Sequence, residues 1–290
     1  MSILWNNHYL YLVVAIGLSL LAVASSIVGS TLVLEKQSQL GDAIGHSSYP
    51  GVIIAYMIFQ QRHPIILLMG AVVASLFSIV IIHWLSREKA FHFESILALV
   101  LSSFFGLGMV LMSYIQGNPN FAKTAQAGLN NYIMGQAAYL MRDDVITIGI
   151  VAIFTIIVFL IHYPKIKIVL FDKDFATSIG INVPFFKFLN LLLAIVIIAV
   201  GLKAVGALLI SSLLIAPTII ALQWSNQYEK VLIIGSIASI IAAVGGTYLS
   251  TTIEKLATGP TVVLCLFIMT ILSLIIGPKS TLLKRGEAND

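Results

Sequence analysis

The chain carries one polar stretch that decides its interpretation: Gly41-Asp42-Ala43-Ile44-Gly45-His46-Ser47-Ser48-Tyr49-Pro50-Gly51. Asp42 and His46 are four residues apart, so on a helix they lie on one face, about one turn from each other. A carboxylate oxygen and an imidazole nitrogen at this spacing can reach the same divalent cation. In a simpler alternative, Asp42 caps a helix N-terminus and His46 bonds a backbone carbonyl. The eleven residues alone leave both interpretations open.

The composition around this stretch excludes a soluble globular protein. Hydrophobic residues make up 59% and charged residues 10% of the chain, whereas a soluble domain is about 25% charged. The apolar runs are continuous and do not alternate with polar residues, which excludes a β-barrel. An intramembrane aspartate is costly, so Asp42 needs a partner or a function there. We therefore predict an all-α, polytopic helical membrane protein with 8–9 transmembrane helices.

Continuous apolar runs of about 20 residues mark the predicted spans. A short, more polar segment within 116–144 is expected to be interfacial or re-entrant, and Pro164–Pro184 is expected to be a polar insert. The predicted spans are 9–34, 41–59, 65–85, 95–115, 145–163, 231–251 and 260–276.

The apolar block Phe185–Trp224 is about twice the length of one span. It is expected to break near Gly201-Leu202-Lys203 and Gly206, giving either two crossing helices or one span and an interfacial helix. Lys and Arg in short loops place the C-terminal tail 278–290 in the cytoplasm. Two crossings give nine spans and an external N-terminus; one crossing gives eight spans and the opposite N-terminal side.

Four stretches in register resemble the membrane subunits of ABC importers for manganese, zinc and iron, the metal-type ABC permease family. The resemblance covers roughly residues 22–277. The stretches are Gly41-Asp42-Ala43-Ile44-Gly45-His46 with Pro50-Gly51, Phe171-Asp172-Lys173-Asp174-Phe175-Ala176 with Gly180, Val205-Gly206-Ala207-Leu208-Leu209-Ile210 with Ala216-Pro217, and Gly259-Pro260.

The resemblance implies a fold, a location and a set of partners. The fold would be that of metal-type ABC permeases, which is similar to the fold of the vitamin B12 importer permease. Residues 1–290 would form a single transmembrane permease domain, and its location would be the bacterial cytoplasmic (plasma) membrane. The partners would be two cytoplasmic ABC ATPase subunits, a second permease copy or a sister permease, an extracytoplasmic metal-binding protein, and membrane lipid. Nucleic acid is not expected.

The resemblance also implies which residues face the translocation path, namely Asp42 and His46. Ser47 is a weaker candidate ligand, because a serine in a membrane helix more commonly bonds a backbone carbonyl. Where the family often has Asp followed closely by Pro before the last span, this chain has Glu254 and no Pro. No metal role is expected for Glu254.

Two cytoplasmic segments, about 165–184 and 222–230, are expected to contact the ATPases, and the second is slightly favoured. The candidate coupling residues are Asp172, Asp174, Phe175, Gln223, Ser225, Asn226, Gln227 and Tyr228.

The sequence predicts a transport subunit without its own ATPase motif. It contains no P-loop pattern, so ATP hydrolysis is expected from partner subunits. A carboxylate with an imidazole suits Mn(II), Fe(II) or Zn(II), and the segment Asn130–Gln136 resembles manganese-type members. We expect transport of manganese, with zinc or iron as alternatives, and no tightly bound cofactor. An ion-coupled secondary carrier is the alternative of another class, although no internal repeat supports it.

Overall fold

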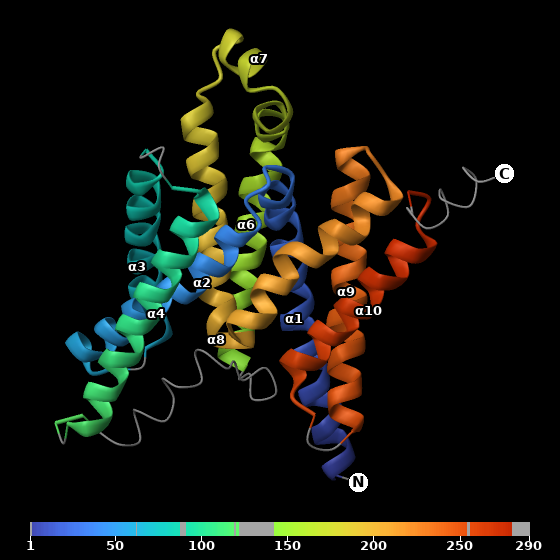
Figure 1. Cartoon of the computed structure of the whole chain (residues 1–290). Helices are drawn as coiled ribbons and strands as arrows, with labels where there is room; N and C mark the ends of the chain where they lie inside the picture. Colours follow the sequence, from blue (N-terminus) through green and yellow to red (C-terminus); the bar gives the residue numbers. More distant parts are fainter. Residues whose placement is uncertain are drawn as a thin grey trace. The chain divides into compact units, whose positions relative to one another are not determined.

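The computed structural model describes residues 2–61, 63–87, 91–118, 120–121, 142–253 and 256–279, and the regular structure within these residues is helical. The helices, in chain order (Figure 1), are α1 (Ser2–Leu34), α2 (Gln39–Phe59), α3 (Pro64–Leu85), α4 (Phe93–Gly117), α6 (Arg142–Phe171), α7 (Lys173–Ser178), α8 (Val183–Trp224), α9 (Tyr228–Thr252) and α10 (Thr258–Ile276).

Seven helical segments in the described part of the chain are long and apolar enough to cross a membrane. They are Tyr11–Leu34, Pro64–Leu85, Phe93–Gly117, Asp144–Phe171, Val183–Ala207, Tyr228–Thr252 and Thr258–Ile276. Leu209–Trp224 is a shorter apolar helix, and α2 adds 21 residues that include the polar stretch. The all-α, multi-pass prediction is confirmed.

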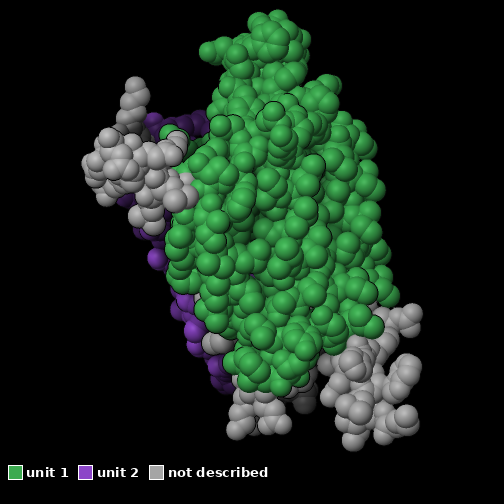
Figure 2. Space-filling model, turned by 90° about the vertical axis from the view of Figure 1, so that its right-hand side faces the viewer, with its two compact units in different colours: residues 1–38, 137–197, 212–290 green, residues 39–136, 198–211 purple. Residues whose placement is uncertain are grey.

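The helices form two compact units, coloured separately in Figure 2. Unit 1 comprises residues 1–38, 137–197 and 212–290, and unit 2 comprises residues 39–136 and 198–211. The division does not test the prediction of one permease domain, because α8 contributes residues to both units.

In unit 2, α2 packs against α3 and α4, and α3 contacts α4. A β-carbon added to Gly51 of α2 would lie 2.1 Å from the carbonyl oxygen of Gly70 in α3. Small residues allow such close backbone approach, the usual way for helices to associate in a membrane. Tyr49, Ile53 and Tyr56 of α2 lie in the buried core beside this crossing.

In unit 1, α1 packs against α6 and α9, and α9 packs against α10. A β-carbon on Gly29 of α1 would lie 2.0 Å from the carbonyl oxygen of Leu214 in α8. Asn190 of α8 donates a hydrogen bond to the Thr31 hydroxyl of α1. This unit is therefore also held by close small-residue contacts and by a buried polar bond.

The long helix α8 breaks at Gly206, where φ is 81° and ψ is 168°. A straight helix would separate Gly201 from Ile210 by about 13.5 Å along its axis. Instead, a β-carbon on Gly201 would lie 2.5 Å from the Ile210 side chain. The chain therefore folds back on itself at Gly206, which lies where the sequence predicts a break in this apolar block.

The break predicted near residues 201–206 lies at Gly206, and residues 201–203 are helical. One boundary prediction is wrong. Pro164 does not end the fifth span, because α6 continues through it to Phe171. A proline removes one backbone donor but leaves the rest of the helical ladder intact, so a long apolar helix can accommodate it. The polar insert is therefore residues 172–182.

Several other predictions lie outside the described residues. These concern the interfacial or re-entrant segment predicted within 116–144, whose core is Leu129–Met141, the manganese-type segment Asn130–Gln136, Glu254, and most of the charged tail 278–290.

Candidate functional site

Helix α2 places Asp42 and His46 together. The helix begins at Gln39, so Asp42 lies inside it and is not its N-cap residue. The imidazole Nε2 of His46 lies 3.6 Å from Oδ1 of Asp42. The His46 side chain is 26% exposed and that of Asp42 is 49% exposed within this chain. The pair therefore faces open space on a helix whose other residues are mostly buried.

A third polar group reaches this pair from α8. The hydroxyl of Ser211 donates to Oδ1 of Asp42 at 3.1 Å. Ser211 is five residues beyond the break at Gly206, and all three residues of the cluster belong to unit 2. The sequence pattern did not single out Ser211, although this residue lies inside the third family-like stretch. A serine among apolar residues was the only available signal.

An aromatic ring covers one side of the imidazole. The rings of His46 and Phe105 of α4 meet edge-to-face, with centroids 5.2 Å apart and planes at 85°. Phe105 also contacts Tyr49 one turn along α2. This packing restricts rotation of the His46 ring, so the position of α4 influences how the imidazole is oriented.

The neighbouring serines have different surroundings. Ser48 donates to the Gly45 carbonyl at 2.7 Å, as a serine in a membrane helix commonly does. Ser47 is fully buried, and its hydroxyl has no hydrogen-bond partner among the described residues. Among the described residues, Ser47 does not make the hydrogen bond to a backbone carbonyl that was expected of it, whereas Ser48 makes one to Gly45. The weak ligand role of Ser47 stays a prediction.

The geometry of the pair suits a shared cation. Two ligand atoms, each about 2.1 Å from an ion and at a tetrahedral angle, lie about 3.4 Å apart. The 3.6 Å between Asp42 and His46 is close to this separation. No group of three His, Cys, Asp or Glu side chains that could hold a metal occurs among the described residues. Within the described residues, Asp42 and His46 therefore supply two candidate ligand atoms, one oxygen and one nitrogen.

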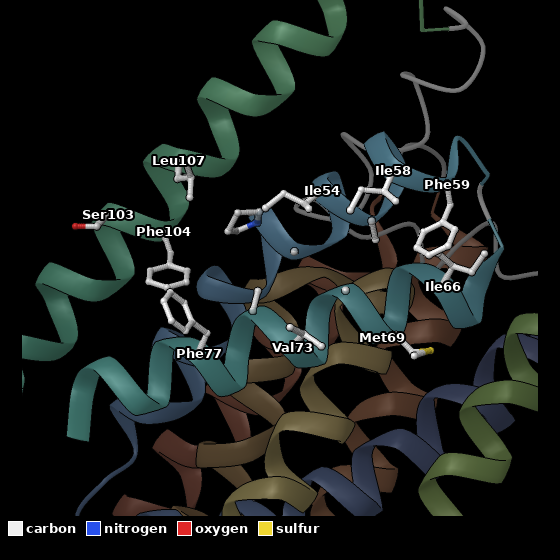
Figure 3. Close-up of a pocket in the computed structure, with 15 residues that line it drawn as sticks. Ile54, Ile58, Phe59, Ile66, Met69, Val73, Phe77, Ser103, Phe104 and Leu107 are labelled. Atoms are coloured by element: carbon white, nitrogen blue, oxygen red, sulfur yellow. The ribbon is translucent and has the colours of Figure 1, made fainter. Parts of the chain in front are cut away.

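A separate groove in unit 2 has the wrong chemistry for an ion. It has a volume of about 630 Å³ and lies among α2, α3 and α4. Figure 3 shows Ile54, Ile58 and Val73 among the side chains that line it. Of its α2 residues, Gly51, Ile54 and Ile58 lie between about a quarter and half a turn around the helix from Asp42 and His46, whereas Pro50 lies one turn along from His46. The groove is apolar and is not part of the polar site.

The match to a known family extends over nearly the whole chain. Residues 7–277 match the ABC 3 transport family. This chain belongs to the ABC 3 transport family. It is accordingly a multi-pass membrane protein of the permease type, as the sequence predicted.

Two similar members of this family carry names that refer to metal transport. The chain is 35% identical over 269 residues to the manganese transport system membrane protein MntC of Bacillus subtilis, covering 91% of this chain and 60% of that protein. It is 33% identical over 266 residues to the zinc transport system membrane protein TroC of Treponema pallidum, covering 92% and 88%. The chain thus spans about 60% of the length of the first relative.

A solved structure has the same fold. PsaBC from Streptococcus pneumoniae, determined in complex with Fab, matches with a TM-score of 0.82 at 23% identity, covering 94% of each chain. At this level of identity the likeness concerns the fold, which confirms the predicted permease architecture.

The first candidate coupling segment of this ABC 3 family chain forms α7. Asp172 is the N-cap residue and accepts from the backbone N–H of Phe175 at 2.8 Å. Asp174 lies exposed in the first turn, and the Phe175 side chain is 51% exposed. Lys173 pairs with Glu35 at 3.7 Å. The segment thus presents a carboxylate and an aromatic ring on a capped helical turn.

The second candidate segment joins α8 to α9. Asn226 and Gln227 are exposed, whereas Ser225 is buried and accepts from the backbone N–H of Gln227 at 3.0 Å. Tyr228 is buried, with its hydroxyl 3.0 Å from that of Ser30.

Residues after α10 also contact this second segment. Gln223 packs against Gly277, and Lys279 donates to the Leu222 carbonyl at 2.8 Å and to the Asn226 side chain. Of the five candidates in this segment, Asn226 and Gln227 therefore offer the most surface to another protein.

Proposed function

We propose that this chain is the membrane-spanning permease subunit of an ATP-driven ABC importer for a divalent transition-metal ion. The observation that carries the proposal is the cluster of Asp42 and His46 on α2 with Ser211 on α8, which gathers a carboxylate, an imidazole and a hydroxyl in an otherwise apolar chain. The names of the manganese and zinc relatives agree with it. Manganese is the first candidate cargo, and zinc or iron are the alternatives.

The proposal includes the partners that such a permease needs. The chain has no P-loop, so two cytoplasmic ATPases would supply the energy. A second permease copy or a sister permease would complete the path, and an extracytoplasmic metal-binding protein would deliver the ion. Asn226, Gln227 and the α7 surface would meet the ATPases.

In this function the ion exchanges part of its water shell for protein ligands. Asp42 supplies charge and an oxygen, and His46 supplies a neutral nitrogen, a pair of donors that suits Mn(II), Fe(II) and Zn(II). The incomplete ligand set keeps binding weak, so the ion can leave toward the cytoplasm.

The direct test measures uptake of radioactive Mn(II) in cells that lack the chromosomal copy of the gene. Asp42→Asn and His46→Gln keep the side-chain size but remove the charge or the ring. We expect each to lower uptake by at least about tenfold, since disturbing a metal's surroundings commonly costs 10- to 100-fold. Glu94→Gln and His63→Gln are matched controls, because both residues are exposed in unit 2 at helix starts.

Wild-type uptake in both site variants, at equal amounts of protein in the membrane, would refute the proposed site. Competition by unlabelled Mn(II), Zn(II) and Fe(II) in wild-type cells then ranks the three ions. Uptake that persists in cells without functional partner ATPases would favour an ion-coupled carrier instead.

A further inference from the structure

The Ser211 hydroxyl lies between two acceptors. Its oxygen is 3.1 Å from Oδ1 of Asp42 and 3.0 Å from the carbonyl oxygen of Ala207, one turn earlier in α8. A serine hydroxyl has one proton to donate and two lone pairs to accept with. It can therefore make a full hydrogen bond to only one of these oxygens at a time.

The two choices have different consequences for the carboxylate. When Ser211 donates to Asp42, it holds the oxygen that lies 3.6 Å from His46 Nε2. A hydrogen bond to a charged group is stronger than one between neutral groups. When Ser211 turns back to the Ala207 carbonyl, its lone pairs point away from the donated proton, toward the side on which Asp42 lies.

We propose that Ser211 is a positioning residue of the Asp42–His46 site, orienting the carboxylate while the site is empty and turning its proton to Ala207 when a divalent cation is bound. A cation beside Oδ1 repels the hydroxyl proton and attracts the hydroxyl lone pair. The Ala207 carbonyl is already in place to accept that proton. The exchange needs rotation about a single side-chain bond.

The position of Ser211 links this exchange to the bend in α8. Ser211 is the fifth residue after Gly206, where the chain folds back. Ile210, its neighbour, packs against Gly201 on the other side of the bend. A change in the bend therefore moves the hydroxyl relative to α2, so the affinity for the ion depends on the conformation of α8.

This inference rests on the proposed function, and its test is designed so that the two can fail separately. Concentration-dependent uptake of radioactive Mn(II) is measured for Ser211→Ala, Ser211→Thr and Asp42→Asn, with the amount in the membrane determined by immunoblot. Ser113→Ala is the matched control, because the Ser113 hydroxyl makes the same backbone bond, to Met109 at 2.9 Å, on an exposed face of α4.

We expect Ser211→Ala to raise the apparent KM for Mn(II) by about tenfold, because the bound cation loses the hydroxyl lone pair turned toward it, and disturbing a metal's surroundings commonly costs 10- to 100-fold in affinity. Ser211→Thr keeps the hydroxyl, and we expect its KM to stay within about twofold of wild type. Ser113→Ala should have the wild-type KM. A KM effect that the threonine variant rescues is not expected from a loss of packing.

A wild-type KM in Ser211→Ala, with Asp42→Asn inactive, would overturn the role of Ser211 and leave the proposed function intact. An equal loss in the Ala and Thr variants would also overturn it. Wild-type uptake by both Asp42→Asn and His46→Gln would refute the proposed metal site itself.

If Ser211→Ala does not accumulate in the membrane, the variant Ser211→Cys tests whether residue 211 lies beside the bound ion. A thiolate beside Asp42 favours softer ions, so competition by Zn(II) against Mn(II) uptake should strengthen several-fold. An unchanged competition profile would overturn the proposal.

Discussion

At the scale of single residues, two positions control the site from α8. Ser211 provides the hydroxyl that reaches Asp42, and Gly206 provides the bend that brings the following helix back. The backbone angles of Gly206, φ 81° and ψ 168°, lie in a region that is essentially restricted to glycine. A side chain at this position would strain the backbone regardless of the space around it.

Gly206→Ala should lower the free energy of unfolding by about 1–3 kcal/mol, the cost of a residue held in such a region. Thermal unfolding of the purified protein in detergent measures the change. The control is Gly245→Ala in α9, where a β-carbon would meet nothing within 4 Å. Alanine has the higher helix propensity, so the control should be as stable as wild type or more so. Equal melting temperatures for both variants would contradict the strained bend.

At the scale of helices, both units depend on close backbone contacts and on few polar bonds. Gly51 and Gly70 allow α2 and α3 to cross with their backbones in contact, and this crossing fixes the helix that carries Asp42 and His46. In unit 1, the Asn190–Thr31 bond joins α8 to α1. Inside a bilayer there is little hydrophobic driving force between helices, so such contacts determine how they associate.

Gly51→Ala should destabilise unit 2 by about 1–3 kcal/mol, as expected for an overpacked contact. The new β-carbon would lie 2.1 Å from the Gly70 carbonyl oxygen, a backbone atom that cannot rotate away. Thermal unfolding in detergent is again the measurement. Gly106→Ala in α4, where a β-carbon meets nothing within 4 Å, should be close to wild type. A melting temperature for Gly51→Ala that equals this control would argue against the close crossing.

The Asn190–Thr31 bond should contribute only modestly. We expect a coupling free energy of about 0.6 kcal/mol from a double-mutant cycle of Asn190→Leu and Thr31→Val, the average for such bonds in membrane proteins. The single change Asn190→Leu should cost less than the bond alone would suggest, because Asn190 Oδ1 has no partner among the described residues and leucine removes that unsatisfied group; this term cancels in the cycle. A coupling above about 2 kcal/mol would show that this bond dominates the contact between the two helices.

At the scale of the whole molecule, contacts within unit 1 restrict how the chain crosses the membrane. Glu229 at the start of α9 accepts from Tyr163 and Lys167 near the end of α6. Residues 172–182, six of them in α7, are too few to recross an apolar core of about 30 Å. Both ends of α8 therefore lie at the same end of unit 1. This favours two passes of α8, the alternative for which the sequence predicts nine spans and an external N-terminus.

Cysteine labelling tests this topology. In a Cys265→Ser background, Lys173→Cys and Asn226→Cys should react with a membrane-impermeant maleimide in inside-out vesicles but not in intact cells. Both positions are exposed in the structure, and the positive-inside rule places their side in the cytoplasm. Gln60→Cys, in the α2–α3 turn, should react in intact cells. Opposite sidedness of positions 173 and 226 would mean that α8 crosses only once.

The sequence by itself determined the all-α membrane class, the family, the positions of the spans and the pairing of Asp42 with His46. The family rests on the four stretches that resemble metal-type ABC permeases, and the other features depend on composition and on helical spacing, which are local properties. The Pro164 boundary was mispredicted because a long apolar helix can continue past a proline at the loss of one backbone bond.

Only the tertiary structure decided that Ser211 reaches Asp42, that α8 folds back at Gly206 alone, and that Tyr228 is buried while Asn226 and Gln227 are exposed. The physical reason is that these features depend on contacts between segments far apart in the chain. Ser211 and Asp42 are separated by 169 residues, so no local pattern of side chains encodes their contact. It arises from how the helix after the bend packs beside α2.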